Sequence, residues 1–284
     1  MANATRILRN RIVLVFDFDG TLGPSTTETL MKNLDMDYEA FNQERNRRIE
    51  EGWHNSLATA DLLREYSHRE DPKITESSMR ETGRNYPLFD GVDTFVERLT
   101  DHTEERDGDI ELHFVLLTAG FLTIPCATPI AEQFYRLYGG ALKFDDEGRI
   151  KAAKRIVNHV DKVQYIRQLA EGRDLPDVEH LEDVYLDRDP EEYFVPLDQI
   201  IYVGDGSSDM SAFQEVVSNG GVGIAIDPEE GGDWAGYEKM AESRRIHNIA
   251  KADYTEGSEL MQSMQLALDG MIARIKLLRL GEGK

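Results

Sequence analysis

The chain has 284 residues, one cysteine and a formal net charge of -22 at neutral pH. That length is sufficient for a substantial hydrophobic core in one or two domains. The acidic charge argues against nucleic acids and anionic membranes as partners, because both would be repelled. A small anionic substrate is still compatible with it, since a lysine or a metal ion can reverse the field inside one cleft.

The cysteine content and the amino terminus bear on the cellular compartment. Cys126 stands alone and cannot form an intramolecular disulfide, which is typical of a reducing environment. The first ten residues carry basic side chains without the apolar core of a signal peptide, and no long apolar run follows. We therefore expect a cytoplasmic protein.

The most informative stretch of the chain is residues 11–21, RIVLVFDFDGT. Its consecutive apolar residues, from Ile12 to Phe16, are typical of a strand buried on both faces of a parallel sheet. The strand leads into Asp17 and Asp19, and Gly20 then permits a sharp turn. Because open α/β sheets bind ligands at the carboxyl ends of their strands, this carboxylate pair is a candidate for chemistry. A strand end with solvated turn aspartates is the alternative.

A helical block follows the first strand. Apolar residues recur at helical spacing over residues 27–67, and residues 74–84 predict a further short helix. Breaks rich in glycine and proline flank the block at 23–25 and 87–91. We expect a small helical cap domain over residues 26–88, whose two connections act as hinges.

Beyond residue 91, strands and helices alternate. We predict helices at 92–100, 127–138, 161–171, 208–217 and 257–280, strands at 111–117, 199–203 and 221–226, and a short hairpin joining 141–144 to 148–151. Strands that are each followed by a helix predict an α/β fold, with a doubly wound parallel sheet and helices on both faces. Residues 1–25 and 89–284 would form this Rossmann-like core, with the cap inserted after the first strand. The terminal helix is a candidate homodimer interface.

Residues 173–198 interrupt the alternation. Nine acidic residues lie between Asp174 and Glu192, interspersed with prolines. Their spacing does not match a calcium-binding loop, so we expect a solvated surface insertion.

Three further element ends carry candidate site residues. Thr118 follows the strand at 111–117, Lys162 opens the helix at 161–171, and Asp205 and Asp209 follow the strand at 199–203. Each has a common structural role: a threonine caps or turns, a lysine is solvated, and Gly-Asp-Gly often forms a plain turn. Their order along the chain is what combines them.

Together these motifs resemble the haloacid dehalogenase-like (HAD) hydrolase superfamily, in its phosphoserine-phosphatase-like branch. The family pattern is an apolar strand with DxDGT, a strand ending in Thr or Ser, a later Lys, and a strand with GDGxxxD or GDGxxD. The chain has VLVFDFDGT at 13–21, FVLLT at 114–118, Lys162, and IIYVGDGSSD at 200–209. A cap between the first two motifs is also found in this branch.

The resemblance implies a Mg²⁺-dependent phosphatase. Asp17 would be the nucleophile that forms an aspartyl-phosphate, and Asp19 would be the general acid and then the general base. Asp17, Asp205 and the backbone carbonyl of Asp19 would hold Mg²⁺. Asp209 would hold a metal-bound water or orient its neighbours. The second aspartate argues for phosphate chemistry, because the dehalogenase members lack it.

The same resemblance implies a phosphate-binding set. Thr118 and the backbone N–H groups of Ala119 and Gly120 would donate hydrogen bonds to the transferring phosphoryl group, and Lys162 would neutralise its charge. Lys162 is preferred because it opens an amphipathic helix ahead of Asp205. Three other lysines compete for this role: Lys143, Lys151 and Lys154.

The expected substrate is a small phosphorylated metabolite. A basic and aromatic cluster at 44–48, with Trp53 and His54, either contacts an anionic leaving group or is the polar face of a helix. Glu28 is a candidate contact for a substrate amine, as in the members that act on serine phosphate. A phosphotransferase or phosphomutase with the same intermediate, and a non-catalytic regulatory protein that retains the fold, are the alternative functions.

Overall fold

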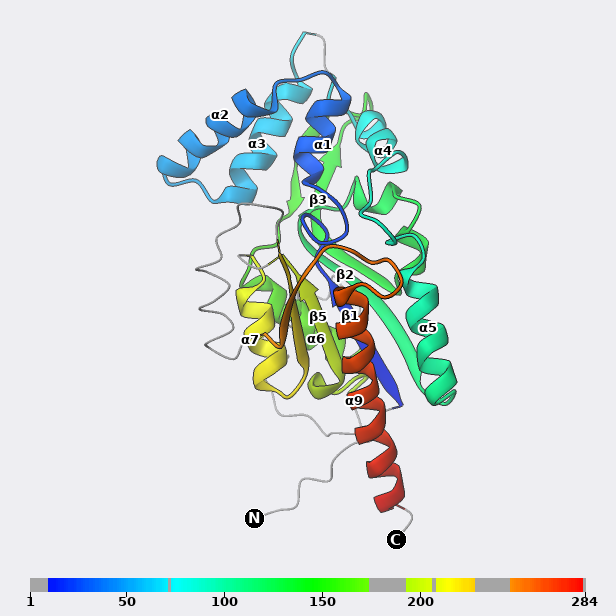
Figure 1. Ribbon diagram of the computed structural model, residues 1–284. Helices are drawn as coiled ribbons and strands as arrows, with labels where there is room; N and C mark the ends of the chain where they lie inside the picture. Colours follow the sequence, from blue (N-terminus) through cyan, green and yellow to red (C-terminus); the bar gives the residue numbers. More distant parts are fainter. Residues whose placement is uncertain (1–9, 71–72, 174–192, 206–207, 228–245, 283–284) are drawn as a thin grey trace.

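The structure, a computed structural model, describes residues 10–70, 73–173, 193–205, 208–227 and 246–282. The strands of this part form one sheet in the order β4-β3-β2-β1-β5-β6-β7 (Figure 1). They are β1 (Arg11–Phe16), β2 (Glu111–Phe121), β3 (Arg136–Phe144), β4 (Ile150–Arg155), β5 (Ile200–Gly204), β6 (Val222–Asp227) and β7 (Asn248–Lys251). Neighbours are parallel except for β3 and β4, which are antiparallel. The α/β fold with a mostly parallel sheet is therefore confirmed.

Strand β1 lies at the topological switch point of the sheet. It pairs with β2 on one side and with β5 on the other, so the chain winds away from it in both directions. Open α/β sheets form a crevice at the carboxyl ends of the strands at such a point. The residues that follow β1 and β5 therefore lie side by side.

Alternate side chains of β1 pack on opposite faces of the sheet. Ile12, Leu14 and Phe16 belong to the core that includes α5 (Phe95–Arg106) and α9 (Glu259–Glu282). Val13 and Val15 belong to the core on the other face, with α6 (Asp161–Ala170) and α7 (Met210–Ser218). Since all five side chains are fully buried, a shift of one residue in register would exchange the two faces, and the position of Asp17 is fixed accordingly.

The described residues of the predicted cap, 26–88, form four helices: α1 (Thr26–Asn33), α2 (Tyr38–Glu50), α3 (Asn55–Ser67) and α4 (Glu76–Arg84). The hairpin of β3 and β4 extends from the sheet to these helices (Figure 1). The backbone N–H of Ile150 donates to the Ser67 hydroxyl at 2.9 Å, and that of Glu76 donates to the Gly148 carbonyl at 2.8 Å. The hairpin therefore contacts the cap helices directly.

The two segments that connect the cap to the core lie against each other. The Tyr86 hydroxyl donates to the Pro24 carbonyl, and the backbone N–H of Phe89 donates to the Leu22 carbonyl at 3.0 Å. A Cβ on Gly23 would lie 2.5 Å from the Tyr86 ring. The glycine at this break is therefore required by the close approach of the returning segment.

The prediction of a helix at 127–138 is wrong. This segment forms two 3₁₀ turns, Pro125–Ala127 and Ala131–Gln133, and then enters β3. Ile130, Phe134 and Tyr138 are spaced four residues apart, as on one face of a helix. All three are buried, but Ile130 and Phe134 flank the second 3₁₀ turn and Tyr138 lies on β3. Proline interrupts regular helix formation in this segment.

Strand β7 is not among the predicted elements, because its four residues at the sheet edge are too few to show an alternation of apolar and polar side chains. The predicted acidic insertion at 173–198 lies mostly outside the described residues. In the part of the chain that the structure describes, no helix combines the length and apolarity needed to cross a bilayer.

Candidate active site

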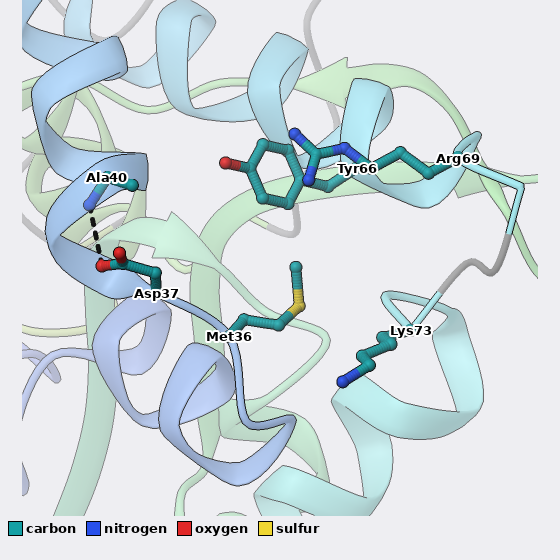
Figure 2. A pocket seen from close by; sticks show the side chains of 6 residues that line it. All are labelled: Met36, Asp37, Ala40, Tyr66, Arg69 and Lys73. Atoms are coloured by element: carbon teal, nitrogen blue, oxygen red, sulfur yellow. Dashed lines mark hydrogen bonds between the residues drawn. The ribbon is translucent and has the colours of Figure 1, made fainter.

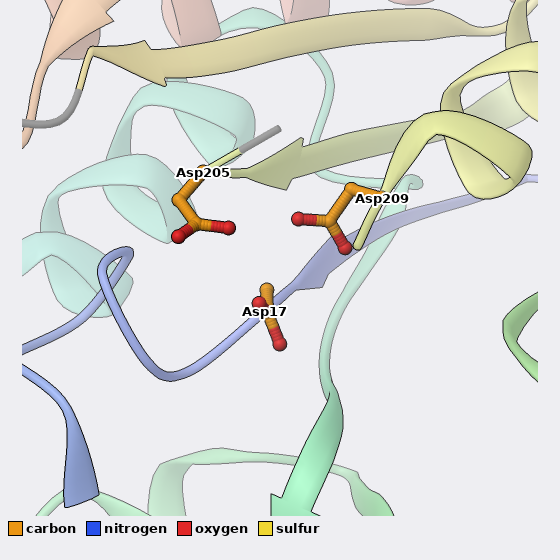
Figure 3. A group of neighbouring side chains, drawn as sticks. All are labelled: Asp17, Asp205 and Asp209. Carbon is orange, nitrogen blue, oxygen red and sulfur yellow. The ribbon is translucent and has the colours of Figure 1, made fainter. Parts of the chain in front are cut away.

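Three carboxylates converge at the carboxyl ends of β1 and β5 (Figure 3). Asp17 follows β1, Asp205 follows β5, and Asp209 precedes α7. One oxygen from each lies within 4.8 Å of the others. Asp17 and Asp209 are buried. We call these three residues the carboxylate cluster; parallel pairing of β1 and β5 is what brings together residues almost two hundred positions apart.

Two glycines allow the backbone to come this close to the carboxylates. Gly20 has a φ of +73°, and a Cβ there would lie 2.6 Å from Asp205 Oδ2. A Cβ on Gly204 would lie 2.4 Å from Asp209 Oδ2. Both distances are far below a normal contact, so larger residues at these positions would displace the carboxylate cluster.

Lys162 joins two members of the carboxylate cluster. Its Nζ atom lies 3.1 Å from Asp17 Oδ1 and 2.5 Å from Asp209 Oδ1, and its side chain is fully buried. It extends from the first turn of α6, which packs on one face of the sheet. The competing lysines are exposed, on β3 and β4: Lys143, Lys151 and Lys154.

Tyr202 is a site residue that the sequence analysis missed. It is fully buried on β5, its hydroxyl donates to Asp209 Oδ1, and Lys162 Nζ donates to that hydroxyl at 3.3 Å. A hydroxyl in the apolar run QIIYV, ahead of the Gly-Asp-Gly turn, was the available signal. The ring packs edge-on against Phe213, with centroids 5.2 Å apart.

The electrostatics of the carboxylate cluster favour an added cation. Burial raises the pKa of Asp17 despite the opposing charge of Lys162. Burial, with repulsion from Asp209, raises the pKa of Asp205 to about 7. Asp17 and Asp209 outweigh the effect of burial on Lys162 and raise its pKa, so that it stays charged. Three crowded carboxylates, of which Lys162 contacts two, fit a hard divalent cation such as Mg²⁺.

Asp19 and Thr118 flank Gly120 beside this cluster. The backbone N–H and the hydroxyl of Thr26 donate to Asp19 Oδ1 and Oδ2, at 2.5 and 3.2 Å. The Gly120 N–H donates to Thr118 Oγ1 at 2.9 Å. A Cβ on Gly120 would lie 3.0 Å from Asp19 Oδ2 and 3.2 Å from Thr118 Oγ1. Burial raises the pKa of Asp19, although the hydrogen bonds from Thr26 oppose this.

A cavity of about 170 Å³ connects these residues to the cap. Asp19, Ala119 and Gly120 line it from the core, and side chains of α1 to α4 line it from the cap. We call it the cap cavity. A larger cavity of about 350 Å³ lies elsewhere on the cap and contains none of the predicted site residues (Figure 2); it is lined by Met36, Asp37, Ala40, Tyr66, Arg69 and Lys73.

Comparison with known proteins bears on the fold. A scan against protein-family models found no match, and neither did a search of curated proteins. Solved structures do match. A HAD-family hydrolase from Salmonella enterica subsp. enterica serovar Typhi is 14% identical, with a TM-score of 0.57, and the match covers 86% of this chain and 68% of that one. A phosphoserine phosphatase in a phospho-aspartyl intermediate analogue form is 13% identical, with a TM-score of 0.56 and coverage of 91% and 99%.

The chain has the fold of the HAD hydrolases, in the form found in phosphoserine phosphatases. A phosphoserine phosphatase from T. onnurineus adds a further example, at 15% identity and a TM-score of 0.53, with coverage of 93% and 98%. The resemblance drawn from the motifs is therefore confirmed at the level of the fold. In this fold the carboxylate cluster lies at the ends of β1 and β5, with Lys162 reaching it from α6.

Proposed function

We propose that the protein is a Mg²⁺-dependent phosphatase that hydrolyses a small phosphate monoester through an aspartyl-phosphate on Asp17. The observation that carries this proposal is the convergence of the carboxylate cluster and Lys162 at the ends of β1 and β5. Phosphoryl transfer depends mainly on positioning and on neutralising charge, and this group of residues is suited to both.

Asp17 is the proposed nucleophile. Its carboxylate attacks phosphorus, the bond from phosphorus to the leaving oxygen breaks, and an aspartyl-phosphate forms. The residue is held by a hydrogen bond from its backbone N–H to the Val203 carbonyl at 2.9 Å and by the ion pair with Lys162. A fixed nucleophile lowers the entropic part of the barrier.

Asp19 is the proposed acid and base. It donates a proton to the leaving oxygen in the first step and accepts one from the attacking water in the second, which releases phosphate and regenerates Asp17. Its two hydrogen bonds from Thr26 fix its orientation. It lines the cap cavity, where the leaving group would lie.

The remaining residues would neutralise and orient the phosphoryl group. Lys162 balances the carboxylates, and Thr118 with the backbone N–H of Ala119 would donate hydrogen bonds to phosphoryl oxygens. Asp17 and Asp205, with the backbone carbonyl of Asp19, would hold Mg²⁺, which when bound supplies positive charge to a dianionic substrate. Asp209 would hold Lys162 in place, because the two form a buried pair.

The test is hydrolysis of p-nitrophenyl phosphate with Mg²⁺, with the metal chelated, and with the metal restored. We expect phosphate release with metal, loss on chelation and recovery on restoration, with no acceptor other than water. Release that depends on an added acceptor would instead indicate a phosphotransferase. Undiminished release after complete metal removal would overturn the proposal.

A further inference from the structure

We infer that the cap cavity selects a short leaving group that carries an anionic group and hydroxyls but no ammonium group, with Arg45 as the specificity-determining residue. This inference rests on the proposed phosphatase function, because it concerns the part of the substrate beyond the phosphate. It follows from the charges around the cavity and from its size.

Arg45 differs from the other arginines of α2 in its partners. Arg47 pairs with Glu44 and Glu51, and Arg48 pairs with Asp61, Glu65 and again Glu44. Arg45 lines the cap cavity, and its guanidinium donates to the neutral side chain of Asn42. Among the described residues no carboxylate pairs with it.

The Arg45 guanidinium also has unused hydrogen-bonding capacity. Its Nε atom is buried and has no hydrogen-bond partner among the described residues. A buried donor left unpaired is costly, more so on a charged group, and a ligand carboxylate or phosphate would pair with this planar group. Arg45 is therefore an anion-binding group placed at a cavity that also contains Asp19.

The cap cavity offers no carboxylate for an ammonium group. Asp19 is the acidic residue among its described lining residues, and both of its oxygens already accept hydrogen bonds from Thr26. Glu28, the candidate for an amine contact, pairs with Lys32 at 2.7 Å instead and is not among the lining residues. A substrate amine would meet Arg45 without a compensating charge, which disfavours it.

The size of the cavity and the polar part of its lining fit a short chain with hydroxyls, and the remaining lining is apolar: Leu30, Leu63, Met79, Phe121 and Ile124. About 170 Å³ is well below the range of roughly 300–1,000 Å³ for drug-sized ligands, so the leaving group has few carbon atoms. Hydroxyl and amide groups that can hydrogen-bond to substrate hydroxyls project from α1 and α3 and the loop before α1: Ser25, Thr26, Thr27, Asn55, Ser56 and Thr59.

The experiment compares kcat/KM across short phosphate esters that differ in the charged and polar groups they carry beyond the phosphate; glycerol 3-phosphate and 3-phosphoglycerate differ only at the terminal carbon. The set is glycerol 3-phosphate, 3-phosphoglycerate, 1,3-propanediol bisphosphate, O-phosphoserine and O-phosphoethanolamine, with p-nitrophenyl phosphate as the generic substrate. We expect 3-phosphoglycerate or the bisphosphate to exceed glycerol 3-phosphate by about 10- to 100-fold, as for a charge-assisted hydrogen bond. The preferred one of the two identifies the anion as carboxylate or phosphate. O-phosphoserine should fall below 3-phosphoglycerate, and O-phosphoethanolamine should be poorest.

Arg45→Gln should remove the advantage of the anionic substrates, and Arg45→Lys should restore part of it. Arg47→Gln is the matched control, because Arg47 lies on the same helix, is exposed and pairs with Glu44 and Glu51; the ratio should stay unchanged. The inference would be overturned if Arg45→Gln left the kcat/KM ratio of the anionic substrates to glycerol 3-phosphate unchanged, or if the wild-type enzyme preferred either ammonium-bearing substrate. Normal hydrolysis of p-nitrophenyl phosphate would leave the phosphatase proposal intact in either case. If the enzyme hydrolysed none of these esters, both the phosphatase proposal and the inference about Arg45 would be overturned.

Discussion

The carboxyl edge of the sheet and helix α2 of the cap both carry many charges, but they hold them differently. At the sheet edge, Lys162 and Asp209 have no exposed surface and form a pair between α6 and the N-cap of α7. On α2, Arg47 has 56% of its side chain exposed and pairs with Glu44 on the same helix and with Glu51 at its C-cap. Exposed pairs of this kind contribute about 0–1 kcal/mol, whereas buried ones are costly to break.

This difference assigns separate tasks to the two regions. Charges at the sheet edge are fixed by tertiary structure and are suited to chemistry that tolerates little displacement. Exposed charges on α2, such as Arg47, can be exchanged with little cost to the fold, so this part of the cap can change which substrate is bound without changing the reaction. Among the charged side chains of α2, Arg45 lines the cap cavity together with Asp19.

The largest expected effect follows from replacing the proposed nucleophile. Asp17→Asn should reduce phosphatase turnover by about a thousandfold or more, because an amide cannot form the aspartyl-phosphate. Circular dichroism should show an intact fold. Asp61→Asn in the cap is the matched control: Asp61 pairs with Arg48 and Arg64, and its removal should change turnover less than about threefold. Equal losses in both variants would contradict the division between the two regions.

The next effect concerns the metal and is read out by stability. Wild-type protein should gain about 2–3 kcal/mol in its free energy of unfolding at a Mg²⁺ concentration of about a hundred times Kd. Asp205→Asn should be more stable than wild type without metal, because it removes one of three crowded carboxylates, and should lose most of the Mg²⁺ gain. Thermal unfolding with and without Mg²⁺ measures both. An unchanged response in the variant would show that Asp205 does not hold the ion.

Tyr202→Phe should have a smaller effect, through the position of Lys162 and Asp209. Loss of the buried hydroxyl removes a hydrogen bond worth about 1 kcal/mol, so kcat should fall about three- to tenfold with little change in KM. The ring should keep its packing against Phe213. Tyr165→Phe, a buried tyrosine in the same core, should leave kcat unchanged. A Tyr202→Phe enzyme with wild-type kcat would remove Tyr202 from the site.

The smallest effect concerns His113, a half-buried side chain at the amino end of β2, and the change of stability with pH. Burial, and then the charge of Arg11, lowers the pKa of His113, whose Nε2 accepts a hydrogen bond from Arg11 Nε at 3.2 Å. The unfolded chain therefore takes up this proton first as pH falls below about 6.5, and the folded state loses stability. Urea unfolding at about pH 7.5 and about pH 5.5 should show a larger loss for wild type than for His113→Asn. The opposite order would mean that the folded state favours the charged ring.

The sequence predicts the sheet-edge region well because its motifs follow directly from strand ends. β1 and β5 are short aliphatic runs that end in Asp-x-Asp and Gly-Asp-Gly, and parallel pairing brings such ends together. Lys162 is harder to predict, since several lysines precede Asp205 and the geometry of α6 alone distinguishes it. Tyr202 was missed because its hydroxyl acts only after the strand is buried beside Lys162.

The cap illustrates what the sequence could not provide. The cluster at 44–48 was consistent with both a substrate contact and a polar helix face. In the structure Arg45 lines the cap cavity and Arg47 pairs along the helix, and a substrate contact by Arg45 stays a prediction. The helix predicted at 127–138 failed for a related reason. Regular spacing of buried side chains reports burial, and here 3₁₀ turns and a strand supply it.

The central claim is that Asp17 carries the phosphoryl group during turnover. The most direct measurement is to quench the enzyme during turnover with Mg²⁺ and a phosphate ester, reduce it with borohydride, and map the products by mass spectrometry. Borohydride converts an aspartyl-phosphate to homoserine, so we predict homoserine at position 17 that is absent without substrate or metal. Turnover with an unmodified Asp17, or with the modification on another carboxylate, would contradict the account.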